Sequence, residues 1–296
     1  MDIHRSWVGE YCTALDMEGA SITLMRLDDD LQNWLDHPCE TPALRVEQSQ
    51  GAAEARPRQE RASEPARSAK AVDHEALKTG GDIGPPEFLA MIHAGAEAIF
   101  AARDRLCELD GEIGDGDHGI TMETGWKAVL EDLSSIGENT TITEICDRIA
   151  DVFLDAVGAS AGPLYATGFG TAGQAVSDRL NLDATSLAKW LDGLAQGIAT
   201  RGEAKLGEKT MLDAWRPAAD AALAHAKEAS SAYICLSAAS EAAKAGAVAT
   251  AGMRSAKGRS KKLGDRALGH IDPGAESAAI LMAAWSRRSL NVKLQT

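Results

Sequence analysis

The chain has 296 residues, of which 45% are apolar and only 4% aromatic, so one or two domains with a core built largely from Ala, Leu, Ile, Val and Met are expected. Its net charge of −14 at pH 7 argues against binding to nucleic acid, because such a surface repels phosphate backbones. A nucleotide can still bind if metal ions screen the carboxylates around it.

Five cysteines lie far apart in the sequence and form neither a CxxC pair nor a zinc-binding spacing, so packing roles are expected for them. The N-terminal residues MDIHRSWVGEY lack the apolar stretch of a signal peptide. No apolar run approaches the roughly 18 residues of a membrane span. These features predict a reduced, soluble, cytoplasmic protein that does not associate with membranes.

Residues 1–46 contain one predicted strand and one predicted helix. Alternating apolar residues predict a strand over 21–27 (SITLMRL), and the acidic residues that follow it predict the start of a short helix over 27–35. No second convincing strand occurs in the chain, and a lone strand cannot satisfy its own backbone groups. We therefore expect this strand to belong to a sheet whose other strands are missing from this sequence.

Residues 47–82 have the composition of a linker. Between Val46 and Val72 the only hydrophobic residue is Ala. Such a segment cannot bury enough apolar surface to offset the entropy of ordering, so a flexible, disordered linker is predicted.

From Pro85 onward the apolar residues recur at helical spacing almost to the end of the chain. Pro85 and Pro86 open the first helix. Glycine-rich joints separate it from further helical stretches at 119–135, 141–157, 163–180, 185–200, 210–228, 231–256 and 273–290. Eight helices with short joints predict an all-α bundle or closed helical barrel.

The strongest chemical signal is the segment LDGEIGDGDHG at residues 109–119. It places Asp110, Asp115 and Asp117 within eight residues, among glycines that let the backbone turn tightly. Carboxylates crowded in this way repel one another unless a hard cation binds them, and Mg²⁺ prefers a few carboxylates plus phosphate oxygens. The alternative is a polar turn in which Asp117 caps the next helix.

Two predicted helix starts could hold phosphate, because the first N–H groups of a helix have no helical partner. One is HGIT at residues 118–121, where His118 could equally be an ordinary turn histidine. The other is HIDPG at 270–274, where Asp272 and Pro273 suit a plain helix cap. A basic segment precedes the second start and could meet phosphates or simply be solvated; its members are Arg254, Lys257, Arg259, Lys261, Lys262 and Arg266.

The segment GEAKLGEKT at residues 202–210 nearly matches a P-loop, G-x4-G-K-[ST]. Glu208 interrupts the motif, and no predicted strand precedes it. The P-loop interpretation is therefore rejected.

Four segments occur together in the order found in one known family: LDGEIGDGDHG at 109–119, GPLY at 162–165, RGEAKLGEKTMLDAW at 201–215 and KGRSKKLGDRALGHIDPGA at 257–275. Over about residues 84–290 the chain resembles the L (nucleotide-binding) domain of dihydroxyacetone (glycerone) kinases. The resemblance implies a barrel of eight antiparallel helices that binds ATP or ADP and two Mg²⁺ at one end.

The resemblance also implies site residues. The magnesium ligands would be Asp110, Asp115 and Asp117. The nucleotide contacts would be His118, Gly119, Ile120, Thr121, Ser160, Ala161, Gly202, Met211, Arg259, Asp272, Pro273 and Gly274. Because the family usually has GGASGPLY where this chain has VGASAGPLY, the paired contact at 160–161 moves to 159–160 if a gap is introduced.

Residues 8–46 resemble the C-terminal end of the family's K (ketose-binding) domain, which single-chain ATP-dependent members join to L by a flexible linker. The implied organisation is a K-domain fragment at 1–46, a linker at 47–82 and an L domain at 83–296. Most of K, with the histidine that binds the ketose covalently in the family, is absent from this sequence.

The implied function is ATP-dependent phosphoryl transfer to dihydroxyacetone or a similar small ketose. This chain would supply MgATP, and a K-type partner would present the ketose and the general base, since no residue here suits that role. Two alternatives are an ADP-carrying L subunit that a phosphotransferase-system protein rephosphorylates, and an inactive product of a truncated gene. The linker and the K fragment argue against the ADP-carrying type.

Overall fold

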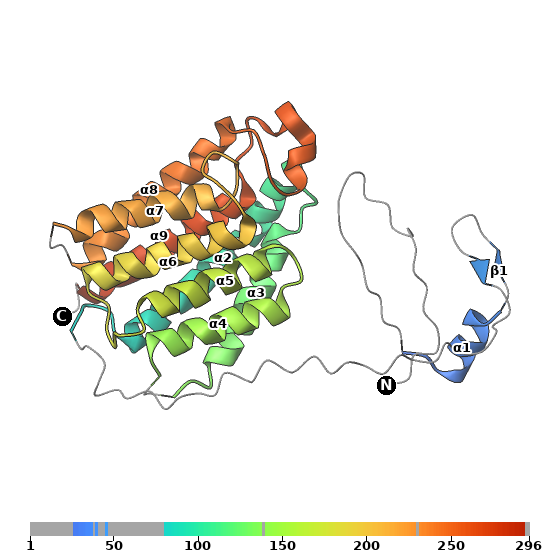
Figure 1. Cartoon of the computed structure of the whole chain (residues 1–296), viewed down its shortest axis with the longest axis horizontal. Helices are drawn as coiled ribbons and strands as arrows, with labels where there is room; N and C mark the ends of the chain where they lie inside the picture. The colour runs from blue at the N-terminus through green and yellow to red at the C-terminus, as the bar shows by residue number, and fades with distance from the viewer. Residues whose placement is uncertain are drawn as a thin grey trace. The chain divides into compact units, whose positions relative to one another are not determined.

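Figure 1 shows the computed structural model of the chain, which describes residues 26–37, 39–40, 45–46, 80–137, 140–228 and 231–293. The chain forms two compact units, Met1–Ala71 and Val72–Thr296.

The first unit contains a short helix, α1 (Asp29–Leu35), which agrees with the helix predicted over 27–35. Asp28 caps it, because its side chain accepts a hydrogen bond from the Leu31 N–H at 2.8 Å. The strand predicted over 21–27 falls mostly outside the described residues, and residues 26 and 27 have no regular structure.

Two short strands in this unit correct the expectation that no further strand occurs. β1 (Cys39–Glu40) pairs antiparallel with β2 (Arg45–Val46), with Cys39 opposite Val46. Each strand is two residues long, too short to produce the alternating pattern on which strand prediction depends.

The second unit is built from eight helices in the described part of the chain, which confirms the predicted all-α barrel. Their bounds are α2 (Pro85–Ile113), α3 (His118–Leu133), α4 (Ile142–Ala156), α5 (Ala161–Ala175), α6 (Ala184–Gly202), α7 (Leu212–Ala226), α8 (Ala232–Ala249) and α9 (Pro273–Lys293). Each helix packs against the next one in sequence, and α9 returns against α2, which closes the ring (Figure 1). Neighbours joined by short loops run antiparallel.

Two helices end earlier than predicted: α5 at residue 175 rather than 180, and α8 at residue 249 rather than 256. At the end of α8 the Thr250 carbonyl accepts hydrogen bonds from the Lys209 ammonium at 2.7 Å and from the Met253 N–H at 3.0 Å. The i+3 bond tightens the last turn into the 3-10 helix η1 (Thr250–Gly252). Likewise the Gly173 carbonyl accepts from Val176 N–H, three residues on, at 3.2 Å.

The few aromatic residues of the barrel are concentrated in its interior, so the core is less purely aliphatic than the composition suggested. The fully buried rings belong to Phe88, Trp126, Phe153, Tyr165, Phe169, Trp190, Trp215 and Trp285. Several meet edge to face, such as Phe88 and Trp190 with ring centroids 5.2 Å apart, a geometry that adds about 0.5–1.5 kcal/mol to simple burial. Alanines line many of the helix contacts and let the helices approach closely around these rings.

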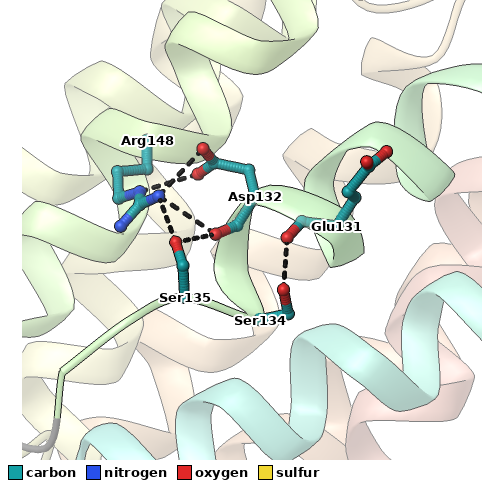
Figure 2. A network of polar contacts seen from close by, with 5 residues as sticks. All are labelled: Glu131, Asp132, Ser134, Ser135 and Arg148. Atoms are coloured by element: carbon teal, nitrogen blue, oxygen red, sulfur yellow. Dashed lines mark hydrogen bonds and ion pairs between the residues drawn. The ribbon is translucent and has the colours of Figure 1, made fainter.

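A polar network fastens the junction between α3 and α4 (Figure 2). Arg148 of α4 forms a bidentate ion pair with Asp132 near the end of α3, at 2.6 Å and 2.8 Å. The same guanidinium donates to the Asp132 carbonyl at 3.0 Å and to the Ser135 hydroxyl at 3.2 Å. It thereby satisfies one of the C-terminal carbonyl groups that a helix end leaves open.

The N-terminal edge of the barrel is also fastened at Asp82 and Ile83. Ile83 is fully buried and forms an isolated β-bridge with Leu182. The Asp82 carboxylate accepts from the Ala232 N–H at 2.7 Å, and its carbonyl accepts from the Tyr233 hydroxyl at 2.8 Å. The ordered barrel therefore includes Asp82, one residue before the predicted start at 83.

Candidate functional site

All the predicted site residues lie at or beside four junctions between consecutive helices. In an antiparallel ring of eight helices, the α2–α3, α4–α5, α6–α7 and α8–α9 junctions meet at the same end. The hydrogen bonds of Asp82, the β-bridge of Leu182 and the ion pair of Arg148 lie at the opposite end. The ring therefore gathers segments that are distant in sequence, for example His118 and Ser277, which are 159 positions apart and whose Nε2 and Oγ lie 2.9 Å from each other.

Three carboxylates converge at the α2–α3 junction. Oxygen atoms of Asp110, Asp115 and Asp117 all lie within 4.8 Å of one another. Asp110 sits in the last turn of α2, and its Oδ2 accepts from the N–H groups of Asp117 at 2.9 Å and His118 at 3.2 Å. A side chain at Gly114 would clash with Asp110, since an added Cβ would lie 2.3 Å from its Oδ1.

The hydrogen bonds of Asp110 contradict the alternative in which Asp117 caps α3. The Asp117 side chain makes no capping hydrogen bond, and Asp110 supplies the acceptor for the first N–H groups instead. The side chain of Asp117 is thus available to bind a cation.

The donor chemistry of this cluster fits Mg²⁺. Its oxygen-only ligands, partly exposed and close together, are those that hard cations prefer. A positive charge already reaches the cluster, because Arg259 forms an ion pair with the Asp115 carboxylate. Arg259 begins the 3-10 helix η2 (Arg259–Ala267), so the basic segment predicted to meet phosphates lies against the carboxylates.

The start of α3 lies next to the start of α9. The His118 imidazole pairs through Nε2 with the Ser277 hydroxyl, which in turn donates to the Gly274 carbonyl at 2.9 Å. Because Ser277 uses its one proton on Gly274, His118 must donate from Nε2. Burial lowers the pKa of His118, against the raising effects of Asp110 and Asp117, so a neutral imidazole with an unprotonated Nδ1 is favoured.

Gly119 is required by a close approach of two helices. A Cβ placed there would lie only 2.0 Å from the Arg103 carbonyl of α2. The first turn of α3 can therefore contact the α2 backbone directly, which brings the α3 N–H groups beside the carboxylate cluster. Ile120, the next residue, is 54% exposed and faces away from the core.

Asp272 caps α9, as the sequence predicted. Its Oδ2 accepts from the Ala275 N–H at 2.8 Å, and its own N–H donates to the Thr250 hydroxyl at 2.9 Å. Burial raises the pKa of Asp272 to about 7, although the Ala275 hydrogen bond and the Lys209 charge lower it. Beside it, Gly274 lies against Met211, since an added Cβ would be 3.3 Å from the Met211 Cβ.

Three predicted contacts belong to other junctions than the carboxylates do. Ser160 and Ala161 begin α5, and Gly202 ends α6, where an added Cβ would lie 3.0 Å from Leu164 of α5. Within the described part of the chain, Ser160 and Ala161 make no hydrogen bond to the carboxylate cluster. These residues share the end of the barrel but not the cluster itself.

Sequence reasoning missed several residues that organise this end. Lys209 is buried between the α6–α7 and α8–α9 junctions, and Thr250 and Ser277 link helix ends through their hydroxyl groups. Lys209 belongs to the near-match to a P-loop. Rejecting that motif was correct, because the segment joins two helices and follows no strand, but the rejection also removed this lysine from consideration.

Comparison with known proteins decides the family. Residues 112–287 match the DAK2 domain family, and residues 1–43 match the Dak1 domain family. The chain belongs to the DAK2 domain family. It is 38% identical, over 177 residues, to the ADP-binding subunit DhaL of the PEP-dependent dihydroxyacetone kinase of Escherichia coli, an alignment that covers 60% of this chain and 84% of that subunit.

Longer relatives match nearly the whole chain. It is 31% identical over 277 residues to a D-erythrulose kinase of Mycolicibacterium smegmatis, which covers 92% of this chain and 47% of that kinase. The chain thus spans about half the length of this relative. The crystal structure of the dihydroxyacetone kinase of C. freundii has the same fold, with a TM-score of 0.56 and 22% identity over 88% of this chain and 43% of that one.

These relatives confirm the predicted resemblance and place the DAK2 family chain among kinase-type enzymes. The C. freundii kinase was also solved in complex with AMP-PNP and Mg²⁺, again with the same fold, at a TM-score of 0.54. Within the described residues, no helix has both the length and the apolar character needed to cross a membrane.

Proposed function

We propose that this chain is the nucleotide-binding half of an ATP-dependent kinase that phosphorylates dihydroxyacetone or a similar small ketose. The observation that carries the proposal is the convergence of three carboxylates beside the first turn of α3. The E. coli relative that is named as an ADP-binding subunit, and the AMP-PNP and Mg²⁺ in the solved kinase, support the same ligand class.

In this proposal Asp110, Asp115 and Asp117 hold two Mg²⁺ ions. Bound Mg²⁺ neutralises phosphate charge and aligns the phosphates for transfer. Asp110 orients the site, because the hydrogen bonds from the Asp117 and His118 N–H groups fix its carboxylate. Asp115 and Asp117 lie on the junction itself, where they can face a ligand.

The nucleotide phosphates would meet the first turn of α3, from His118 to Thr121, because N–H groups at a helix start suit anions. The N–H groups of Gly119 and Ile120 would serve, since those of His118 and Thr121 already donate to Asp110 and to the Asp117 carbonyl. Arg259 would add a positive charge from η2. The remaining proposed nucleotide contacts are Ser160, Ala161, Gly202, Met211, Asp272, Pro273 and Gly274. Phosphoryl transfer depends mainly on positioning and charge neutralisation, which is what this arrangement supplies.

No general base for the acceptor hydroxyl is assigned to this chain. We propose that a K domain, on the same polypeptide or on another, binds the ketose and supplies the base. The match of residues 1–43 to the Dak1 domain supports a K-domain fragment at 1–46, followed by a linker at 47–82 and the L domain at 83–296.

A second candidate is an ADP-carrying subunit that is rephosphorylated in place. The 38% identity to the E. coli ADP-binding subunit favours it, whereas the match over 92% of this chain to an erythrulose kinase favours direct use of ATP. The release rate of a fluorescent ADP analogue, chased with excess MgATP, distinguishes them. Fast exchange supports the ATP-using kinase, and retention of ADP through many turnovers supports the carrier.

The direct test of the proposed function combines binding and turnover. Calorimetry should show heat of binding for MgADP and for the MgATP analogue AMP-PNP, and none for dihydroxyacetone alone. A coupled assay should then show phosphorylation of dihydroxyacetone only when an intact K domain is added. Binding of free ketose by this chain would contradict the division of roles.

A further inference from the structure

Lys209 is a buried lysine in the α6–α7 junction. Only 1% of its surface is exposed, and its backbone adopts the left-handed conformation with φ at +60°, which is uncommon for a residue with a side chain. Burying an ammonium group is costly unless hydrogen bonds and opposite charges compensate for the lost hydration. The surroundings of Lys209 supply both.

The Lys209 ammonium bridges two backbone carbonyl groups. It donates to the Thr250 carbonyl at the end of α8, at 2.7 Å, and to the His270 carbonyl just before α9. The Asp213 carboxylate provides an opposite charge in its neighbourhood, and Asp272 adds to it where it is ionised. One side chain from the α6–α7 junction thereby connects both ends of the α8–α9 junction.

The junction that presents Lys209 is itself held in place by Asp213. The Asp213 carboxylate is buried and accepts from the Gly207 N–H at 2.6 Å and from the Thr210 N–H at 2.8 Å. These bonds close the loop on both sides of Lys209 and fix the direction of its side chain. The strained backbone at Lys209 is thus stabilised by a local acceptor in the first turn of α7.

The bridge continues into the cap of α9. The Thr250 hydroxyl donates to the Ala247 carbonyl at 2.6 Å and accepts from the Asp272 N–H at 2.9 Å. Asp272 in turn caps α9 through the Ala275 N–H. The residues on both sides of Ile271 are therefore held by hydrogen bonds. The His270 carbonyl accepts from Lys209, and the Asp272 N–H donates to Thr250.

We propose that Lys209 is a positioning residue, which holds the segment His270–Gly274 in the conformation that a nucleotide meets. Lys209 acts through the backbone and is not assigned a contact with the nucleotide. The functional half of this inference, that Lys209 supports nucleotide binding, rests on the proposed function. The structural half, that Lys209 holds the segment His270–Gly274 in place, does not.

The structural half is tested without any ligand, by amide hydrogen exchange on the full chain. Lys209→Met keeps the length of the apolar stem and removes the ammonium. Exchange in residues 268–274 and 250–253 should accelerate by about tenfold or more, a local loss of roughly 1.4 kcal/mol or more, while exchange in α3, α4 and α5 stays within about twofold. Lys189→Met, at an exposed position on α6, is the matched control and should change neither region.

The functional half is tested by calorimetry with MgADP at a temperature where the variants are folded. Lys209→Met should weaken MgADP binding by about tenfold or more, and Lys189→Met should leave it unchanged. Lys209→Ala should regain affinity when propylammonium chloride is added, compared with sodium chloride at equal ionic strength. A role as bulk alone is tested by Lys209→Met, which keeps the stem and would in that case bind MgADP like the wild type.

Thr250→Val serves as an independent variant if Lys209→Met fails to fold, since it removes the hydroxyl that accepts from Asp272 N–H and nearly preserves shape. It should give the same local acceleration at 270–274. The proposal is overturned if exchange rises throughout the barrel, or if both the local exchange and the MgADP affinity of Lys209→Met equal those of the wild type. If the wild type binds no MgADP, the proposed function fails, while the exchange result still decides the structural half.

Discussion

The guanidinium of Arg259 forms an ion pair with the carboxylate of Asp115. This contact joins the basic 3-10 helix η2 to the carboxylate cluster at the α2–α3 junction. In the absence of a metal ion, Arg259 thus partly compensates the repulsion among the three carboxylates. It also competes with any cation for Asp115.

Replacing Arg259 should therefore affect metal and nucleotide binding in opposite directions. An ion pair this exposed contributes about 0.2–1 kcal/mol, so Arg259→Gln should bind Mg²⁺ alone more tightly, by up to about fivefold. The same variant should bind MgADP more weakly, because the phosphates lose a positive partner. Titration with Mn²⁺ monitored by electron paramagnetic resonance measures the first effect, and calorimetry measures the second.

Arg254→Gln is the control for this pair of measurements. Arg254 is an exposed residue of the same basic segment, and it pairs with Asp265 rather than with the carboxylate cluster. Equal changes in Arg254→Gln and Arg259→Gln would show that only the general charge of the segment matters, and the ion pair with Asp115 would then have no specific role.

The contact between α2 and α3 should not tolerate a methyl group at Gly119. The Cβ of Gly119→Ala would meet the Arg103 carbonyl at 2.0 Å, so the two backbones must separate. We expect a loss of about 1–3 kcal/mol in the free energy of unfolding. Gly111→Ala is the matched control in the preceding helix, because nothing lies within 4 Å of its added Cβ, and it should be neutral or slightly stabilising. Chemical denaturation of both variants checks this, and equal stability of the two would contradict it.

Local sequence patterns predicted the helices and singled out the carboxylate segment, whereas the closed barrel and the magnesium-binding role were implied by the family resemblance. Eight stretches with helical periodicity were separated by glycine-rich joints, and Asp110, Asp115 and Asp117 are close in sequence as well as in space. The four junctions of the site meet because successive helices of the ring run in opposite directions. Every second junction therefore lies at the same end of the barrel. Local patterns thus predicted the helices and located the carboxylate segment, and the family resemblance supplied the closed ring and the site residues.

Contacts between distant segments could not be predicted in the same way. Lys209 meets Thr250 across 41 residues and His270 across 61, and no local pattern marks such a pair. The early end of α8 coincides with the same bridge, which reaches the Thr250 carbonyl where the helix tightens into η1. The two-residue strands β1 and β2 were missed because they are shorter than any detectable period.

Asp272 should make the stability of the barrel depend on pH. Burial raises its pKa to about 7 in the folded state, whereas the unfolded value is near 3.8. Between these values the folded state binds more protons than the unfolded state, so stability is fully present below about pH 4 and falls as the pH rises to about 7. The slope from this group should approach about 1.4 kcal/mol per pH unit.

The contribution of Asp272 is isolated by comparison with Asp272→Asn. The variant keeps the size of the side chain but cannot titrate, so its denaturation midpoint should fall less than that of the wild type between pH 5 and pH 7. Parallel pH profiles for the two proteins would mean that Asp272 stays ionised throughout this range.

The ordered barrel should begin before Ile83. A chain starting at Gly80 retains the Asp82 hydrogen bonds to Ala232 and Tyr233 and should melt at the temperature of the full chain. A chain starting at Gly84 lacks these bonds and the burial of Ile83, which alone is worth about 1.5–3 kcal/mol, and should melt at a lower temperature. A lower melting temperature for the Gly80 chain than for the full chain would show that earlier residues stabilise the barrel.

The central claim is that the carboxylates at the α2–α3 junction bind the magnesium of a nucleotide, and Asp117→Asn tests it most directly. Asp117 makes no capping hydrogen bond, so the substitution removes charge without removing a structural acceptor, unlike a change at Asp110. Calorimetry should show a loss of MgADP affinity of at least about tenfold, equal to roughly 1.4 kcal/mol, with unchanged helical content by circular dichroism. Asp104→Asn, on the exposed face of α2, should bind like the wild type. Equal MgADP affinity for the wild type and Asp117→Asn would contradict the account and leave the cluster as a turn without a bound metal.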